Sequence, residues 1–264
     1  MERLFSNAPI MAKNDEVRRG LWDLARAHRI MELEGHNDMS LGHCSMRDPW
    51  DRGVWLKRGN LGLEEVQEED FILIDFEGNV LGGSGVRHLE WPIHTELLRA
   101  RPEANFVCHT HPLYATLFSA TREKLLPLTN EGAWFSIPPP HYLTTSDLID
   151  TVELGRDLAK CLGKAEAVFL RNHGMCVVGA DVKQMTLAAI FLEKACRAQI
   201  ILAQSGLKHS APPKAEIDKK RKTIYPVRAQ NNFWDYYNRR LDRKERAEER
   251  RLSGGAIPDR GEYR

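Results

Sequence analysis

The chain has 264 residues, of which 42% are hydrophobic and 28% are charged, as in a globular protein with one large domain or a domain plus an appendage. Its formal net charge of +1 gives no excess of positive charge for binding nucleic acid or an acidic membrane surface. No apolar run is long enough for a membrane-spanning helix, and the N-terminal stretch lacks the apolar segment of a signal peptide. The 5 cysteines show no paired spacing, so we expect reduced thiols in a cytoplasmic protein.

Hydrophobic periodicity predicts a mixed succession of helices and strands along most of the chain. The first helix is expected at residues 14–34, where apolar residues recur at helical spacing until Gly35. Further helices are expected from residue 88 to Pro102, at 113–120, at 146–162 and from Asp181 onward. Strands are expected within residues 38–48, 53–59, 71–83, 105–112 and 167–179. Because strands and helices do not alternate regularly, we expect an α/β domain layered around a central sheet.

The last quarter of the chain has a different composition. Residues 210–230 are polar and contain prolines, which is typical of a linker, so we divide the chain into a domain at 1–208 and an extension at 209–264. The extension contains a charged helix that begins with four aromatic side chains: Phe233, Trp234, Tyr236 and Tyr237. Such a helix buries little by itself, so we predict that it packs across a subunit interface near the metal of another subunit; the alternative is that it folds back on its own domain.

Two histidines interrupt the apolar run NFVCHTHPLYATLFSA. His109 and His111 are separated by one residue, and in a strand such residues point to the same face. Two imidazoles that converge on one point predict a metal site, although buried histidines can also be hydrogen-bonded parts of a core.

A third histidine and a carboxylate complete the candidate metal site. His173 follows an apolar strand and lies between Asn172 and Gly174, which predicts a turn at the edge of the sheet. Glu90 lies on the helix that leads into the strand of His109. Three imidazoles and one carboxylate form a ligand set suited to zinc, manganese or iron.

The run HLEWPIHTELLRARPEANFVCHTHP, followed later by LRNHG, resembles the class II aldolase/adducin family over about residues 16–206. The resemblance implies a three-layer α/β/α fold with a mainly antiparallel central sheet, to which the C-terminal helical extension is added. It also implies that His109, His111 and His173 bind one divalent metal ion per subunit. Glu90 would be either a further ligand or the acid–base group beside the metal. Members of the family usually form tetramers with sites between subunits, so we expect a homotetramer.

The chain departs from the phosphosugar aldolases of this family at three motifs. Those enzymes typically have Gly-Asn-x-Ser where this chain has GHCS, Ser-Ser-Glu where it has HLE, and Thr-Gly where it has Arg58-Gly59. The lost hydroxyl and amide groups are suited to a phosphate, whereas arginine binds a planar carboxylate through two parallel hydrogen bonds. We therefore expect a small carboxylated substrate, unless the charges of Lys57 and Arg58 are simply solvated. The predicted substrate-binding residues are His43, Ser45, Lys57 and Arg58.

Some family members decarboxylate hydroxylated aromatic or heteroaromatic acids, and the run from Gly42 to Pro49 is similar to that branch. We therefore predict a metal-dependent carbon–carbon lyase of this kind, with Glu90, His88 and Tyr142 as candidate proton donors. An aldolase acting on a small non-phosphorylated hydroxy-keto acid is the first alternative, because retro-aldol cleavage uses the same flow of electrons. A non-catalytic adducin-like scaffold is the second alternative.

Overall fold

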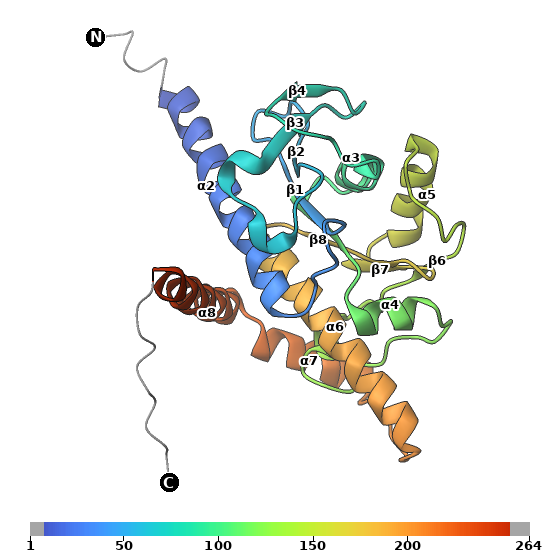
Figure 1. Ribbon diagram of the computed structural model, residues 1–264. Coiled ribbons are helices and arrows are strands. Elements are labelled where there is room, and N and C mark those ends of the chain that lie inside the picture. Colours follow the sequence, from blue (N-terminus) through green and yellow to red (C-terminus); the bar gives the residue numbers. More distant parts are fainter. Residues whose placement is uncertain (1–7, 254–264) are drawn as a thin grey trace.

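The structure is a computed structural model and describes residues 8–253 (Figure 1). One 8-stranded sheet forms its centre, in the order β4-β3-β2-β1-β5-β8-β7-β6. The strands are β1 (His43–Arg47), β2 (Val54–Lys57), β3 (Phe71–Ile74), β4 (Val80–Gly82), β5 (Phe106–Thr110), β6 (His141–Tyr142), β7 (Ala167–Leu170) and β8 (Gly174–Gly179). Every described pair of neighbours is antiparallel except β6 and β7, which run parallel.

Helices cover both faces of the sheet (Figure 1). They are α2 (Ala8–Leu33), α3 (Trp91–Ala100), α4 (Leu113–Ser119), α5 (Val152–Leu162), α6 (Val182–Ser205), α7 (Lys214–Ile224) and α8 (Val227–Leu252). Helices α2, α4, α6 and α8 contribute to one hydrophobic core, and α3 and α5 contribute to the other. On β5 the neighbours Val107 and Cys108 belong to opposite cores, because side chains alternate along a strand. This arrangement confirms the predicted three-layer α/β/α fold with a mainly antiparallel sheet.

Two helices, α5 and α2, begin at other residues than the sequence predicts. The helix expected at residues 146–162 begins only at Val152, and Thr151 caps it by accepting a hydrogen bond from the Leu154 amide. In the segment before this helix, the Ile149 amide donates to the Glu90 carboxylate. The first helix, in contrast, already begins at Ala8.

The segment expected to be a linker at residues 210–230 contains the helix α7. Its composition is polar, but Ile217 and the following Tyr225 are buried, with 3% and 7% of their surfaces exposed. These two buried apolar side chains hold the short helix against the rest of the protein. The assignment of a linker to these residues is therefore wrong for 214–224.

The C-terminal helix α8 folds back on its own domain. Trp234, Tyr237 and Leu241 are buried in the same hydrophobic core as α2 and α6. Charged side chains join α8 to α2, among them the pair Arg29–Glu245 at 2.8 Å. Within the single chain these side chains pack on their own domain, while Tyr236 remains 47% exposed. Contact of α8 with a neighbouring subunit stays a prediction.

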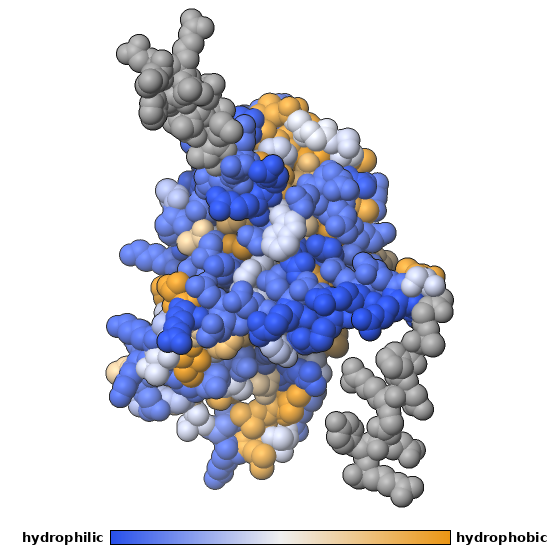
Figure 2. Space-filling model, turned by 90° about the vertical axis from the view of Figure 1, so that its left-hand side faces the viewer, coloured by the Kyte–Doolittle hydropathy of each residue, from blue (hydrophilic) through white to orange (hydrophobic). Residues whose placement is uncertain are grey.

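The face that carries α2 and α8 is mainly hydrophilic (Figure 2). This agrees with the charged C-terminal helix that the sequence predicts. Among residues 8–253, no helix is both long and apolar enough to cross a membrane.

Candidate metal centre

The sheet brings three histidines together at one end of β5. His109 is on β5, His111 follows its last residue, and His173 lies in the three-residue turn between β7 and β8. The Nε2 atoms of His109 and His111 are 3.0 Å apart. Because β5 and β8 are antiparallel, the end of β5 lies beside the start of β8, next to the turn that carries His173. Asn172 adopts a positive φ of 56°, which turns the chain so that His173 joins the pair.

Gly174 allows this close approach. A Cβ atom at this position would lie 2.6 Å from Cδ2 of His111 and 2.6 Å from the carbonyl oxygen of Thr110. No side chain fits there without displacing His111. The glycine after His173 is thus required for the packing of the two histidines and not only for the turn.

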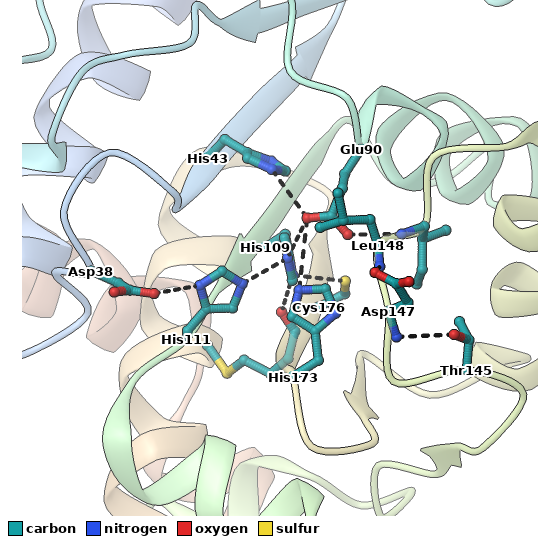
Figure 3. A network of polar contacts seen from close by, with 12 residues as sticks. Asp38, His43, Glu90, His109, His111, Thr145, Asp147, Leu148, His173 and Cys176 are labelled. Atoms are coloured by element: carbon teal, nitrogen blue, oxygen red, sulfur yellow. Dashed lines mark hydrogen bonds and ion pairs between the residues drawn. The ribbon is translucent and has the colours of Figure 1, made fainter.

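Glu90 reaches the histidines from the start of α3, and its carboxylate lies above His109 and His173 in Figure 3. It is the residue before the first turn of α3, and its Oε2 lies 3.2 Å from Nε2 of His109 and 3.7 Å from Nε2 of His173. Its other oxygen, Oε1, accepts a hydrogen bond of 2.9 Å from the Ile149 amide, which fixes the carboxylate. The ligand atoms of Glu90, His109, His111 and His173 all lie within 4.8 Å of one another.

The tautomers of two histidines show that the cluster suits a cation. Nδ1 of His109 faces the carbonyl oxygen of Met175 at 3.0 Å, and Nδ1 of His111 faces the Asp38 carboxylate at 2.9 Å. Both acceptors require a proton on Nδ1, so in its neutral form each ring directs the lone pair of Nε2 at the other ring, and that of His109 also at Glu90. Three electron-rich atoms this close repel one another unless a proton or a metal ion lies between them. The donor set therefore fits a divalent ion, and one carboxylate with three imidazoles is compatible with zinc, manganese or iron.

The ionisation of the four groups follows from the same geometry. Burial opposes the charge on Glu90, but His109, His173 and the Ile149 amide together lower its pKa to about 2. Burial also disfavours a charged His109, yet the Glu90 carboxylate outweighs this and raises the pKa of His109 well above its usual value. Burial, followed by the charge of His109, lowers the pKa of both His111 and His173 to about 4. Without a metal, His109 is therefore protonated and forms an ion pair with the Glu90 carboxylate, while His111 and His173 are neutral.

A second group of histidines adjoins the metal-binding cluster. Nδ1 of His43 is 2.7 Å from Nε2 of His94, and Nδ1 of His94 is 2.6 Å from Oγ of Ser45. The other nitrogen of His43 lies 4.0 Å from Oε2 of Glu90, and the His88 ring packs against His43 at a centroid distance of 4.2 Å. Burial is the main cause that lowers the pKa of His43 and His94 well below the usual value, so both rings are neutral.

A cavity of about 720 Å³ borders the metal-binding cluster and the second group of histidines. Its polar lining includes His43, His88, Glu90, His111 and His173. Its apolar lining consists of four leucines, Leu41, Leu89, Leu113 and Leu148. Within the described part of the chain, neither lysine nor arginine lines this cavity.

Two predicted substrate-binding cations lie elsewhere. Lys57 is fully buried, and its Nζ donates to the carbonyl oxygens of Ser40 and Leu61. The guanidinium of Arg58 instead pairs with Asp70 at 2.8 Å. Neither lines the cavity of this chain. A buried ammonium group that already satisfies two carbonyls cannot turn to a substrate without leaving both unpaired.

Two further predicted residues are also outside the cavity. The Tyr142 hydroxyl donates to the carbonyl oxygen of Leu154 at 3.4 Å, and its ring is buried in the core beneath α5. Ser45 contacts His94 rather than the cavity. The structure thus brings together His43, His88 and the four predicted metal ligands, and it adds Asp38. His94, one helical turn after Glu90, contacts His43 and Ser45 instead of Glu90. No spacing in the sequence identifies Asp38, because it lies on a loop far from the residue it contacts.

Comparisons of the sequence and of the fold relate this chain to known proteins. Residues 22–200 match the family described as Class II Aldolase and Adducin N-terminal domain. The meiotically up-regulated gene 14 protein of Schizosaccharomyces pombe is 30% identical over 209 residues, which cover 78% of this chain and 77% of that protein. A 3,4-dihydroxyphthalate decarboxylase of Terrabacter sp. is 28% identical over 194 residues, which cover 69% of this chain and 81% of that enzyme.

A solved structure extends the likeness to the whole fold. The L-fuculose 1-phosphate aldolase from Glaciozyma antarctica PI12 superposes with a TM-score of 0.78 and 25% sequence identity. The alignment covers 89% of this chain and 93% of that chain. Both decarboxylases and aldolases therefore occur among its relatives, and the family match spans most of the sequence. This chain belongs to the class II aldolase and adducin family.

Proposed function

We propose that this protein is a divalent-metal-dependent carbon–carbon lyase that decarboxylates a hydroxylated aromatic or heteroaromatic carboxylic acid. The observation that supports this most is the lining of the cavity: a cluster of metal-binding type beside four leucines, with no lysine or arginine among the described lining residues. A phosphosugar needs hydroxyl, N–H or cationic donor groups for its phosphate, and this chain departs from the phosphosugar aldolases at the three motifs that supply such groups. A hydroxy acid instead brings its own neighbouring oxygens to a metal, and its flat ring contacts apolar walls.

The reaction breaks the bond between the ring and the carboxyl carbon. The electron pair stays on the ring carbon, carbon dioxide leaves, and a proton forms the new carbon–hydrogen bond. A bound divalent ion supplies Lewis-acid stabilisation of the negative charge that develops as carbon dioxide leaves. In this proposal His109, His111, His173 and Glu90 bind that ion, one per subunit.

The proton transfer is assigned to His88 in this proposal. Its Nε2 is buried and has no hydrogen-bond partner among the described residues, and the ring lines the cavity. Burial, followed by the charge of Lys57, lowers the pKa of His88 to about 4, so the ring is a neutral base at pH 7. It accepts the proton of the substrate hydroxyl and returns it to the ring carbon. Glu90, whose pKa is lowered to about 2, remains ionised and acts as a ligand.

Two substrates taken from the relatives test the proposal. The purified protein is loaded with zinc or manganese and incubated with carboxyl-¹³C-labelled 3,4-dihydroxyphthalate, with a panel of hydroxylated benzene and pyridine carboxylates, and with L-fuculose 1-phosphate. We expect labelled carbon dioxide from at least one hydroxylated acid and no cleavage of the phosphosugar. Cleavage of L-fuculose 1-phosphate without decarboxylation of any acid would contradict the proposal. His109→Ala serves as the inactive control.

An aldolase that acts on a small non-phosphorylated hydroxy-keto acid is the second candidate. The observation that favours it is the fold neighbour, which is an aldolase at a TM-score of 0.78. Retro-aldol cleavage also leaves an electron pair on the carbon beside a carbonyl group, and a divalent ion held by the same four residues would supply Lewis-acid stabilisation of that charge. Assays for aldehyde release from hydroxy-keto acids, run on the same protein preparations, separate the two reactions.

The proposal includes assembly as a homotetramer. Leucines at the mouth of the cavity are exposed, with 66% of Leu89 and 62% of Leu113 accessible to solvent in the single chain. Apolar side chains grouped around a cavity mouth are suited to burial against another subunit. Light scattering measures the mass in solution, and a monomer at micromolar concentration would exclude the assembly.

A further inference from the structure

Three buried side chains form a continuous hydrogen-bonded row that ends at the cavity. Ser45 and His94 are fully buried, and His43 is 1% exposed. His43 and Ser45 are two residues apart on β1, so both point to the face covered by α3, and His94 on α3 lies between them. Only His43 of the three lines the cavity.

The protons in this row have two possible arrangements, because in each of its two contacts one atom donates a proton and the other accepts it. In the first, the Ser45 hydroxyl donates to Nδ1 of His94, Nε2–H of His94 donates to Nδ1 of His43, and His43 carries its own proton on Nε2. In the second, every donor is reversed, and Nε2 of His43 is a bare lone pair. The distances of 2.6 Å and 2.7 Å are compatible with both arrangements.

The surroundings of Ser45 favour the first arrangement. In the second, its oxygen accepts a proton from His94, and its own hydroxyl proton then needs another acceptor. Among the described residues, no other side chain or backbone group forms a hydrogen bond with Oγ of Ser45. A fully buried hydroxyl donor without a partner is costly, whereas a hydroxyl oxygen that accepts nothing is not.

The surroundings of His43 favour the same arrangement independently. Its Nε2 faces the carboxylate oxygen of Glu90 at 4.0 Å. A lone pair directed at a carboxylate is repelled, whereas an N–H is attracted. The separation of 4.0 Å is also too long for a direct hydrogen bond, so the N–H remains available to another acceptor in the cavity.

We infer that Ser45 and His94 hold His43 in the tautomer protonated on Nε2, so that this N–H donates a hydrogen bond to an oxygen of the bound anionic substrate. The identity of that anion rests on the proposed function, whereas the tautomer does not. His43 then contacts the substrate, and Ser45 and His94 are positioning residues that act through it. A fixed neutral donor suits the oxygen of a carboxylate or phenolate and takes no part in proton transfer.

Nuclear magnetic resonance reads the tautomer directly. The full-length zinc-loaded protein is labelled with ¹⁵N-histidine, and long-range ¹H–¹⁵N correlations show which ring nitrogen carries the proton. The signals of His43 are assigned from their loss in His43→Gln. We expect protonation on Nε2 in the wild-type protein. We also expect it in His94→Gln, whose amide can still donate to Nδ1 of His43, and a mixture of tautomers in His94→Leu. Protonation of wild-type His43 on Nδ1 would overturn the inference.

Turnover of 3,4-dihydroxyphthalate, or of the acid found in the substrate panel, provides the second readout. His94→Leu should lower kcat/KM about 10-fold and Ser45→Ala about 5-fold, while His94→Gln should recover most of the loss. Ser119→Ala removes another fully buried serine hydroxyl and should leave kcat/KM within about 2-fold. Unchanged turnover in His94→Leu would also overturn the inference. A protein inactive on every acid would contradict the proposed function, but it would not affect the tautomer, which is measured without turnover.

Discussion

Removal of the Asp38 carboxylate should weaken metal binding although Asp38 is not among the predicted ligands. Its Oδ2 accepts a hydrogen bond of 2.9 Å from Nδ1–H of His111 and thereby directs the lone pair of Nε2 toward the metal position. Loss of such a partner typically costs about 10- to 100-fold in metal affinity. The Asp38 side chain is 31% exposed, so solvent screens part of its charge. We therefore expect Asp38→Ala to lower zinc affinity by about 10-fold, or about 1.4 kcal/mol.

A competition titration with a chromogenic zinc chelator at pH 7 measures this affinity. The matched control is Asp147→Ala, because Asp147 lines the same cavity but its carboxylate accepts only from the Leu148 amide among the described residues. The control removes the same charge without removing a hydrogen bond to a ligand, and its affinity should stay within about 3-fold of the wild type. Equal losses in Asp38→Ala and Asp147→Ala, or no loss in Asp38→Ala, would refute the role of the His111 hydrogen bond.

Three further outcomes follow from the structure. Zinc binding at pH 7 should release about one proton per chain, because the raised pKa of His109 keeps this ring protonated until it binds the metal. Calorimetry in buffers of different ionisation enthalpy measures the released protons, and the absence of any release would contradict this prediction. Burial lowers the pKa of His36 to about 3, so between pH 6.5 and pH 3 only the unfolded chain binds this proton, and His36 alone should contribute about 2 kcal/mol to the fall in the free energy of unfolding between pH 7 and pH 5. Urea titrations at both pH values should show a smaller fall in His36→Gln but not in His209→Gln, at an exposed site. Gly174→Ala should displace His111 and lower the metal content measured by mass spectrometry, and full occupancy would show that the turn can adapt.

Local patterns predict those parts of the site that depend on neighbouring residues in the chain. His109 and His111 converge because they are two residues apart at the end of a strand, and that period is visible in the sequence. His173 is predictable as a turn residue because Asn172 and Gly174 flank it, and Asn172 does adopt a positive φ.

The remaining contacts depend on the register between distant segments. The row Ser45–His94–His43 requires α3 to cross β1 at one particular position, and no periodicity specifies that crossing. Lys57 is a second example, since a lysine close to the site in the sequence suggests a substrate contact. Two loop carbonyls, which only the tertiary structure brings together, satisfy its ammonium group instead. The helix α7 is missed for a similar reason, because its polar sequence becomes helical only when Ile217 is buried against the domain.

The rate of carbon dioxide release as a function of added metal is the most direct test of the proposed decarboxylase. Chelator-treated protein is titrated with zinc or manganese, and ¹³CO₂ is measured from carboxyl-labelled 3,4-dihydroxyphthalate or from the best acid of the panel. We predict that the rate rises in proportion to added metal and saturates at about one ion per chain, and that His109→Ala stays inactive throughout. Carbon dioxide release at full rate in the chelated protein, or stoichiometric metal binding without decarboxylation of any hydroxylated acid, would contradict the proposed function.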